Sequence, residues 1–225
     1  MLRVAGALAA GVVLSGTAPG PSPDTDAARL MPGLFLYAAP GIADSRFAES
    51  VVLLIRHGPE GSMGLVVNRP TEMPLREALE NVAEARTSKL TVYWGGPVQS
   101  EAILALVRAP SPSPGAQTVL PDVHLTGDLA DVRAALSAPD PAGRLRVYTG
   151  YAGWTAGQLP VEVRAGVWVL DKADAATVFA ADPSKLWPRV EEILKRLEVR
   201  LAPSVSRGQR ERGGGETVSI AAPTR

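Results

Sequence analysis

Hydrophobic runs separated by turn residues divide the middle of the chain into predicted strands and helices. Runs rich in leucine and β-branched residues and bounded by Gly or Pro predict strands, and apolar residues three or four positions apart predict helices. The predicted strands are 34–38, 51–55, 65–67, 92–94, 102–107, 145–149 and 167–170, and the predicted helices are 75–85, 129–136 and 185–198. Strands and helices together predict an α/β protein in the broad sense. Because some strands follow each other without an intervening helix, we expect the α+β class, with a mixed, largely antiparallel sheet flanked by helices.

The two ends of the chain differ in composition from this core. Residues 1–18 carry one arginine, an apolar run and then small residues, which is the order of a secretory signal. The run is too short for the roughly 20 residues that span a bilayer, so no membrane span is expected. Residues 19–29 are typical of a flexible linker and residues 203–225 of a disordered tail. We therefore expect one compact domain over 30–202, exported to the periplasm if 1–18 is a signal and cytoplasmic otherwise.

Composition excludes several kinds of chemistry. The 225 residues include no cysteine and only two histidines, so disulfides, thiolate metal sites, cysteine nucleophiles and a three-histidine zinc site are excluded within one chain. The 23 Lys and Arg balance the 23 Asp and Glu, so no overall positive field attracts nucleic acid. We expect no metal, no cofactor and no strong nucleic-acid binding.

A hydrophobic strand that ends in Arg56-His57-Gly58 resembles the opening motif of histidine phosphatases. In that chemistry a histidine accepts the phosphoryl group, a second histidine and arginines hold its oxygens, and an acid protonates the leaving group. The partners of His57 would be His124, Arg56 and Glu60. The phosphatase motif leads into a helix, however, whereas residues 61–67 lead directly into a strand. A phosphoryl-transfer hydrolase that uses His57 is therefore the alternative and not the preferred hypothesis.

Two glycine-containing segments offer weaker signals. Gly61-Ser62-Met63-Gly64 is not a nucleophile elbow, since Glu60 occupies the position of the first glycine, and a serine in a hairpin turn is the favoured interpretation. Residues 150–159 follow a strand and open a possible short helix, whose free amides are candidates for binding an anion. They lack the P-loop and dinucleotide-binding spacings, so glycines that permit close packing around Trp154 are favoured.

Three blocks of sequence together resemble the YqgE/AlgH family. The first runs from Gly33 through His57 to Asn68-Arg69-Pro70, the second is Tyr93-Trp94-Gly95-Gly96-Pro97-Val98, and the third is Gly150-Tyr151-Ala152-Gly153-Trp154-Thr155-Ala156-Gly157-Gln158-Leu159, with Trp168 and Trp187 downstream. The match keeps its order over residues 30–197. The resemblance implies a compact fold of mixed sheet and helices. Some members carry a regulator's name, but the family implies no established reaction and no standard cofactor.

We therefore predict a non-enzymatic binding or regulatory module whose partner is an unknown small molecule or protein. The glycine loops and the lack of an assignable triad favour binding over catalysis, and the oligomeric state stays open. No residue is assigned a catalytic or metal-binding role. The candidate ligand-binding residues are His57, Asn68, Arg69, Gly95, Gly96, Tyr151, Trp154 and Gln158. Convergence of these side chains on one concave pocket would give the hypothesis a physical site.

Overall fold

A ten-stranded sheet organises the protein in the computed structural model, which describes residues 27–201 and their side chains as far as residue 196. Its strands are β1 (Leu34–Ala38), β2 (Val51–Gly58), β3 (Gly61–Val66), β4 (Pro70–Pro74), β5 (Thr91–Trp94), β6 (Val98–Arg108), β7 (Gln117–Leu120), β8 (Val123–Thr126), β9 (Leu145–Trp154) and β10 (Trp168–Lys172). The main path runs β10-β1-β2-β3-β9-β6-β8-β7, and β5 joins β4 to β9.

Short helices cover this sheet. They are α2 (Leu75–Ala78), α3 (Leu129–Leu136), α4 (Gln158–Arg164), α5 (Ala175–Val178) and α6 (Arg189–Leu201), with 3₁₀ turns η1 (Ser45–Phe47), η2 (Ala83–Ala85) and η3 (Pro183–Lys185). All strand pairs of the described chain are antiparallel except β5 with β9. The structure thus confirms the predicted α+β class, a single domain with a mixed, largely antiparallel sheet and flanking helices.

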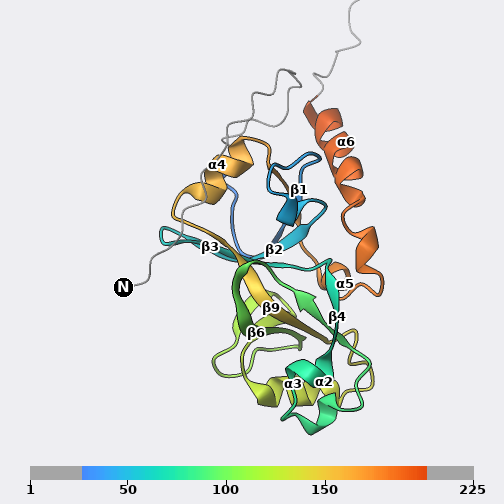
Figure 1. Cartoon of the computed structure of the whole chain (residues 1–225). Coiled ribbons are helices and arrows are strands. Elements are labelled where there is room, and N and C mark those ends of the chain that lie inside the picture. Colours follow the sequence, from blue (N-terminus) through green and yellow to red (C-terminus); the bar gives the residue numbers. More distant parts are fainter. Residues whose placement is uncertain (1–26, 202–225) are drawn as a thin grey trace, which may run out of the picture.

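Strand β9 divides the sheet into two halves. Its first residues pair with β6 and β5, and its last residues, Ala152 to Trp154, pair with β3. Between these stretches lies Gly150, with a φ of +64° that strongly favours glycine. We call β10, β1, β2 and β3 with the end of β9 the β1–β3 half, and β4 to β8 with the start of β9 the β4–β8 half. Helices α4 and α6 flank the first half, and α2 and α3 lie against the second (Figure 1).

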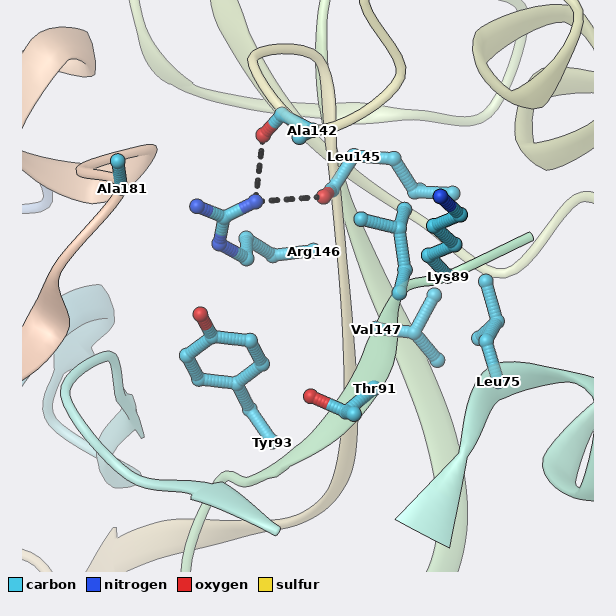
Figure 2. A pocket seen from close by; sticks show the side chains of 10 residues that line it. Leu75, Lys89, Thr91, Tyr93, Ala142, Leu145, Arg146, Val147 and Ala181 are labelled. Carbon is cyan, nitrogen blue, oxygen red and sulfur yellow. Dashed lines mark hydrogen bonds between the residues drawn. The ribbon is translucent and has the colours of Figure 1, made fainter. Parts of the chain in front are cut away.

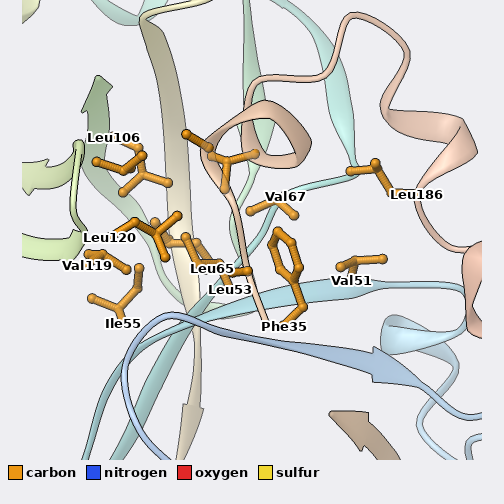
Figure 3. Close-up of a cluster of buried hydrophobic side chains, with 14 of the residues drawn as sticks. Phe35, Val51, Leu53, Ile55, Leu65, Val67, Leu106, Val119, Leu120 and Leu186 are labelled. Carbon is orange, nitrogen blue, oxygen red and sulfur yellow. The ribbon is translucent and has the colours of Figure 1, made fainter. Parts of the chain in front are cut away.

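The core consists of three clusters on the faces of these halves. Strand β2 is buried on both faces, with Val51, Leu53 and Ile55 in one cluster and Val52 and Leu54 in another. Such two-sided burial explains its continuous apolar run, since successive side chains of a strand point to opposite faces. Figure 3 shows the largest cluster, in which side chains of the first strands meet others from both halves and from the C-terminal segment. Apolar packing therefore joins the two halves.

The predicted helix over 75–85 is wrong as a continuous element. Only α2 forms there, and η2 follows after a break at Leu79, whose φ and ψ are −124° and 52°. The apolar positions Leu75, Leu79 and Val82 are nevertheless buried in one cluster. Helical spacing thus identified the buried face, although the backbone turns between its members.

Other element boundaries also differ from the prediction. Helix α6 begins at Arg189, directly after Pro188, because the proline ring disfavours a helical conformation for the residue before it. Strand β9 continues to Trp154, so the glycines at 150 and 153 belong to a strand. The expectations for residues 1–18, for 19–26 of the linker and for 203–225 lie outside the described residues. No helix within residues 27–201 is both long and apolar enough to cross a membrane.

Candidate functional site

His57 lies opposite Ser62 in the hairpin of β2 and β3. Its Nδ1 is 2.7 Å from the Ser62 hydroxyl oxygen, and Ser62 is buried while His57 is half-buried. The neighbouring Arg56 is exposed. His124 lies in the other half on β8, where its ring nitrogens are 3.2 Å from the Thr118 hydroxyl and 3.1 Å from the Ala109 carbonyl oxygen. The two histidines that a phosphatase would need therefore sit in separate environments.

Asn68 and Arg69 hold the connection between β1 and β2. The Asn68 side chain accepts a hydrogen bond from the Val51 amide and donates one to the Glu49 carbonyl, both at 2.9 Å. Glu49 has a φ of +58°, an uncommon conformation for a residue with a side chain. The Arg69 guanidinium donates to the carbonyls of Arg46 and Ala48. Both candidate residues thus have local backbone partners.

Gly95 and Gly96 lie where the chain crosses β9. A Cβ on Gly95 would approach the Gly150 carbonyl oxygen to 2.3 Å, and one on Gly96 would approach the Tyr151 carbonyl carbon to 2.2 Å. Gly96 also has a φ of +149°. Tyr151 pairs with Val98 and packs, half-buried, against the largest core cluster. These glycines allow the two backbones to approach closely at the junction of the halves.

Trp154 and Gln158 converge on a residue that sequence reasoning missed, Glu162. One Glu162 carboxylate oxygen accepts hydrogen bonds from the indole N–H groups of Trp154 and Trp168, each at 2.8 Å. The other accepts from the Gln158 amide at 2.8 Å, and the Gln158 oxygen accepts from the Thr155 amide at 3.0 Å. Gln158 and Glu162 are four residues apart on α4, a spacing that places side chains on one helix face and was the available signal.

A row of aromatic rings connects several of these residues. Trp154 and Trp168 meet edge to face with ring centroids 5.7 Å apart, and Phe47 lies 5.8 Å from Trp168 and 6.0 Å from Trp94. The Arg69 guanidinium carbon lies 5.2 Å from the Trp94 ring centroid. The row thus runs from the end of β9 through β10 and η1 to the end of β5.

The eight candidate residues therefore belong to a network of structural contacts and do not share a cavity. None of them lines the two cavities described below. A ligand-binding role for them stays a prediction.

The better enclosed cavity lies in the β4–β8 half and measures about 240 Å³. Its lining residues are Leu75, Lys89, Leu90, Thr91, Tyr93, Ala142, Leu145, Arg146, Val147 and Ala181 (Figure 2). It forms where the parallel strands β5 and β9 part. Tyr93 and Trp94 pair with Tyr148 and Thr149, whereas Thr91 pairs with Pro74 of β4 and has no ladder partner on β9.

Arg146 is the most unusual residue of this cavity. Its side chain is buried, with 6% of the residue exposed, and among residues 27–196 it has no carboxylate partner. Nη1 donates to the carbonyls of Ala142 and Leu145, and Nη2 donates to Ala180 at 3.0 Å. Nε is buried and has no hydrogen-bond partner in the described part of the chain. Figure 2 shows this guanidinium above the Tyr93 ring, whose centroid is 5.3 Å from the guanidinium carbon.

A second unsatisfied polar atom lies close to Arg146. The hydroxyl of Tyr148, two residues further along β9, is buried and has no partner within residues 27–196. Burial raises the pKa of Tyr148, and the positive charge of Arg146 opposes that shift. The Tyr148 and Tyr93 rings have centroids 5.7 Å apart. The sequence signal for this site was a single cation inside the predicted strand 145–149, which sequence reasoning did not single out.

No group of three or more metal-ligating side chains occurs among the described residues.

Residues 35–202 match the model of a protein family described as AlgH-like. The chain belongs to this family. Other AlgH-like chains include the UPF0301 protein AlgH of Pseudomonas aeruginosa, 35% identical over 178 residues, which are 75% of this chain and 89% of that protein. A UPF0301 protein of Myxococcus xanthus is 40% identical over 161 residues, 70% of this chain and 87% of that protein.

Solved structures agree with the AlgH-like assignment. The solution structure of AlgH from Pseudomonas aeruginosa has a TM-score of 0.55 and 27% identity, and the match covers 90% of this chain and all of that one. A crystal structure of the Corynebacterium diphtheriae protein DIP2367 has a TM-score of 0.57 at 21% identity, covering 76% of this chain and 86% of that one, and shows the shared fold. The resemblance to the YqgE/AlgH family is thus confirmed, and the family is one of uncharacterised function.

Proposed function

We propose that this AlgH-like protein is a non-enzymatic binding module that takes a small-molecule ligand in the cavity between β5 and β9. The observation that carries the proposal is Arg146, a buried cation that lines the cavity and keeps an unpaired Nε. Buried polar groups in proteins are nearly always satisfied, so an unsatisfied one at a cavity is a candidate contact for a ligand. A regulatory role would then consist of a response to that ligand.

The cavity suits a test that blocks it without disturbing the core. Ala181 lines its rim and is exposed, so Ala181→Trp should fill the entrance while the packing beneath remains. Ala165 is an exposed alanine at the end of α4, away from the cavity, and Ala165→Trp is the matched control. The measurement is a thermal-shift screen of small carboxylates, phosphates, nucleotides and neutral metabolites. A ligand present at 100 times its Kd should stabilise the fold by about 2.7 kcal/mol.

We expect wild type and Ala165→Trp to respond to the same ligand and Ala181→Trp to lose the response. An equal response of both tryptophan variants would place the ligand elsewhere and contradict the cavity proposal. Absence of any response across the screen would contradict small-molecule binding altogether.

The alternative, a phosphoryl-transfer hydrolase, has one supporting observation, the 2.7 Å contact between His57 and Ser62. A general phosphatase assay on wild type and His57→Ala tests it. Hydrolysis that His57→Ala abolishes would favour the enzyme, whereas equal background rates would remove His57 from any catalytic role. The phosphate oxygens would be held by Arg56 or Arg69 in this hypothesis. Arg69 already donates to two backbone carbonyls, which weighs against its use and leaves the exposed Arg56.

A further inference from the structure

We infer that the cavity between β5 and β9 is an anion site, and that its ligand carries a carboxylate or phosphate group that pairs with Arg146. This inference rests on the proposed function and specifies the chemistry of the ligand.

The charges that line the cavity point to an anion. Two of the lining residues are cations, Lys89 and Arg146, and none is acidic. Arg146 is buried, whereas Lys89 is exposed and also lines the neighbouring second cavity. A buried charge without a partner of opposite sign is costly, because the desolvation of the ion is not offset. An anionic group would supply the missing partner.

The free donors of Arg146 suit a group with two oxygens. A guanidinium has five N–H donors, and three of them are directed to the carbonyls of Ala142, Leu145 and Ala180. The Nε donor and one donor on Nη2 remain. Nε and Nη2 lie on the same side of the guanidinium, and a carboxylate or phosphate that accepts from both nitrogens would be held by two hydrogen bonds.

The three carbonyl contacts also fix the position of the guanidinium before any ligand arrives. Its carbon lies 5.3 Å from the Tyr93 ring centroid and 5.6 Å from that of Phe179. A cation held in this way loses little conformational freedom on binding, which favours affinity. Hydroxyl groups of Thr91 and Tyr93 also belong to the lining and offer further polar contacts (Figure 2).

The size of the cavity limits the ligand. Its volume of about 240 Å³ is below the roughly 300–1,000 Å³ of pockets for drug-sized molecules. A small mono- or dicarboxylate or a compact phosphate ester suits a cavity of this size. We therefore expect small anions as ligands.

The test is an amide chemical-shift titration of the full chain with four probes: acetate, inorganic phosphate, the neutral isostere acetamide, and sodium chloride at matched ionic strength. Amides of Thr91 and Val147 report on the cavity. We expect saturable shifts with acetate or phosphate, with the tighter of the two identifying the preferred group. Acetamide should bind at least tenfold more weakly, and chloride should not reproduce the shifts.

Arg146→Met should abolish the saturable shifts, and Arg164→Met, at an exposed arginine of α4 that does not line the cavity, should keep them. If Arg146→Met does not fold, the wild-type preference for acetate over acetamide decides the question. Equal binding of acetate and acetamide at the cavity would overturn the anion inference and leave the binding module intact. The anion inference would also be overturned if the cavity amides respond to none of the four probes while a neutral ligand binds in the cavity. No response to these probes or to any screened ligand would overturn both proposals.

Discussion

Two charged residues, Glu162 in the β1–β3 half and Arg146 in the β4–β8 half, have opposite hydrogen-bond balances. The Glu162 carboxylate accepts from two indole N–H groups and from the Gln158 amide. Among the residues that the structure describes, Arg146 donates only to neutral carbonyls, and its Nε has no partner. The satisfied carboxylate can gain little from a ligand, whereas the unsatisfied guanidinium can gain a great deal. Under the proposed function, this difference separates a polar cluster that stabilises the fold from one that can take a ligand.

The same contrast holds for the residues around them. Asn68, Arg69 and His57 each have a partner within the protein, as does the Trp154 indole. In the other half, the Tyr148 hydroxyl is buried without a partner. The recognisable sequence blocks therefore mainly encode structural contacts.

The largest effect on stability is expected where the backbone at Gly96 approaches β9. In Gly96→Ala the new Cβ would meet the backbone of Tyr151, and the φ of +149° would be strained. Strain and overpacking of roughly 1–3 kcal/mol each predict a loss of about 4 kcal/mol in the free energy of unfolding. Urea denaturation measures it. Gly157→Ala is the control, since its φ is also positive, at +74°, but no atom lies within 4 Å of the new Cβ. Equal losses in the two variants would show that the crossing is not tightly packed.

The next effect concerns the satisfied cluster. Glu162→Leu should leave the indole N–H groups of Trp154 and Trp168 without an acceptor. At roughly 1–3 kcal/mol for each unsatisfied donor, the free energy of unfolding should fall by about 2–5 kcal/mol. Glu162→Gln keeps one acceptor oxygen and should lose less. Urea denaturation with tryptophan fluorescence reports both stability and the indole environment. A loss below about 1 kcal/mol in Glu162→Leu would mean that the hydrogen bonds of Glu162 contribute little to the stability of the fold.

The smallest effect at neutral pH is expected from Tyr148→Phe, which removes a hydroxyl that has no partner. Stability at pH 8 should stay within about 1 kcal/mol of wild type or rise, because no hydrogen bond is lost. A loss above about 2 kcal/mol would reveal a partner for the hydroxyl.

Alkaline pH should enlarge the difference in stability between wild type and Tyr148→Phe. Burial raises the pKa of Tyr148 above its usual value near 10, so the unfolded chain releases this proton first and the stability of wild type falls as pH rises above about 10. Tyr148→Phe should reduce that slope by up to about 1.4 kcal/mol per pH unit. Burial also raises the pKa of Tyr37 to about 12, so Tyr37→Phe should reduce the slope as well, but only up to that pH. Denaturation curves between pH 8 and 12 measure both, and an unchanged slope in Tyr148→Phe would contradict its raised pKa.

Much of the fold was predictable because burial leaves a local pattern. The apolar runs at 34–38 and 51–55 became β1 and part of β2, and the helix over 129–136 matches α3. The helix over 75–85 failed because its apolar spacing reflects a buried face that a broken backbone also satisfies. Strand β4 was missed, since it is largely exposed and bounded by prolines.

The candidate site was less predictable. Gln158 and Trp154 were singled out, but their shared acceptor, Glu162, was not. Arg146 was overlooked because a lone cation in an apolar strand gives no sign of whether a carboxylate lies nearby. Its environment depends on Ala142, Ala180 and Tyr93, which are distant from one another along the chain.

The sequence alone was enough to predict the family and the α+β class, since these depend on ordered blocks and on local patterns. Which polar groups are satisfied became clear only from the packed structure. It showed that Gly96 and Gly150 lie at one backbone crossing, that two tryptophans share one carboxylate, and that Arg146 is buried beside a cavity with a free donor. Hydrogen-bond satisfaction depends on the positions of atoms from distant segments, and these positions are set only when the strands have paired and packed.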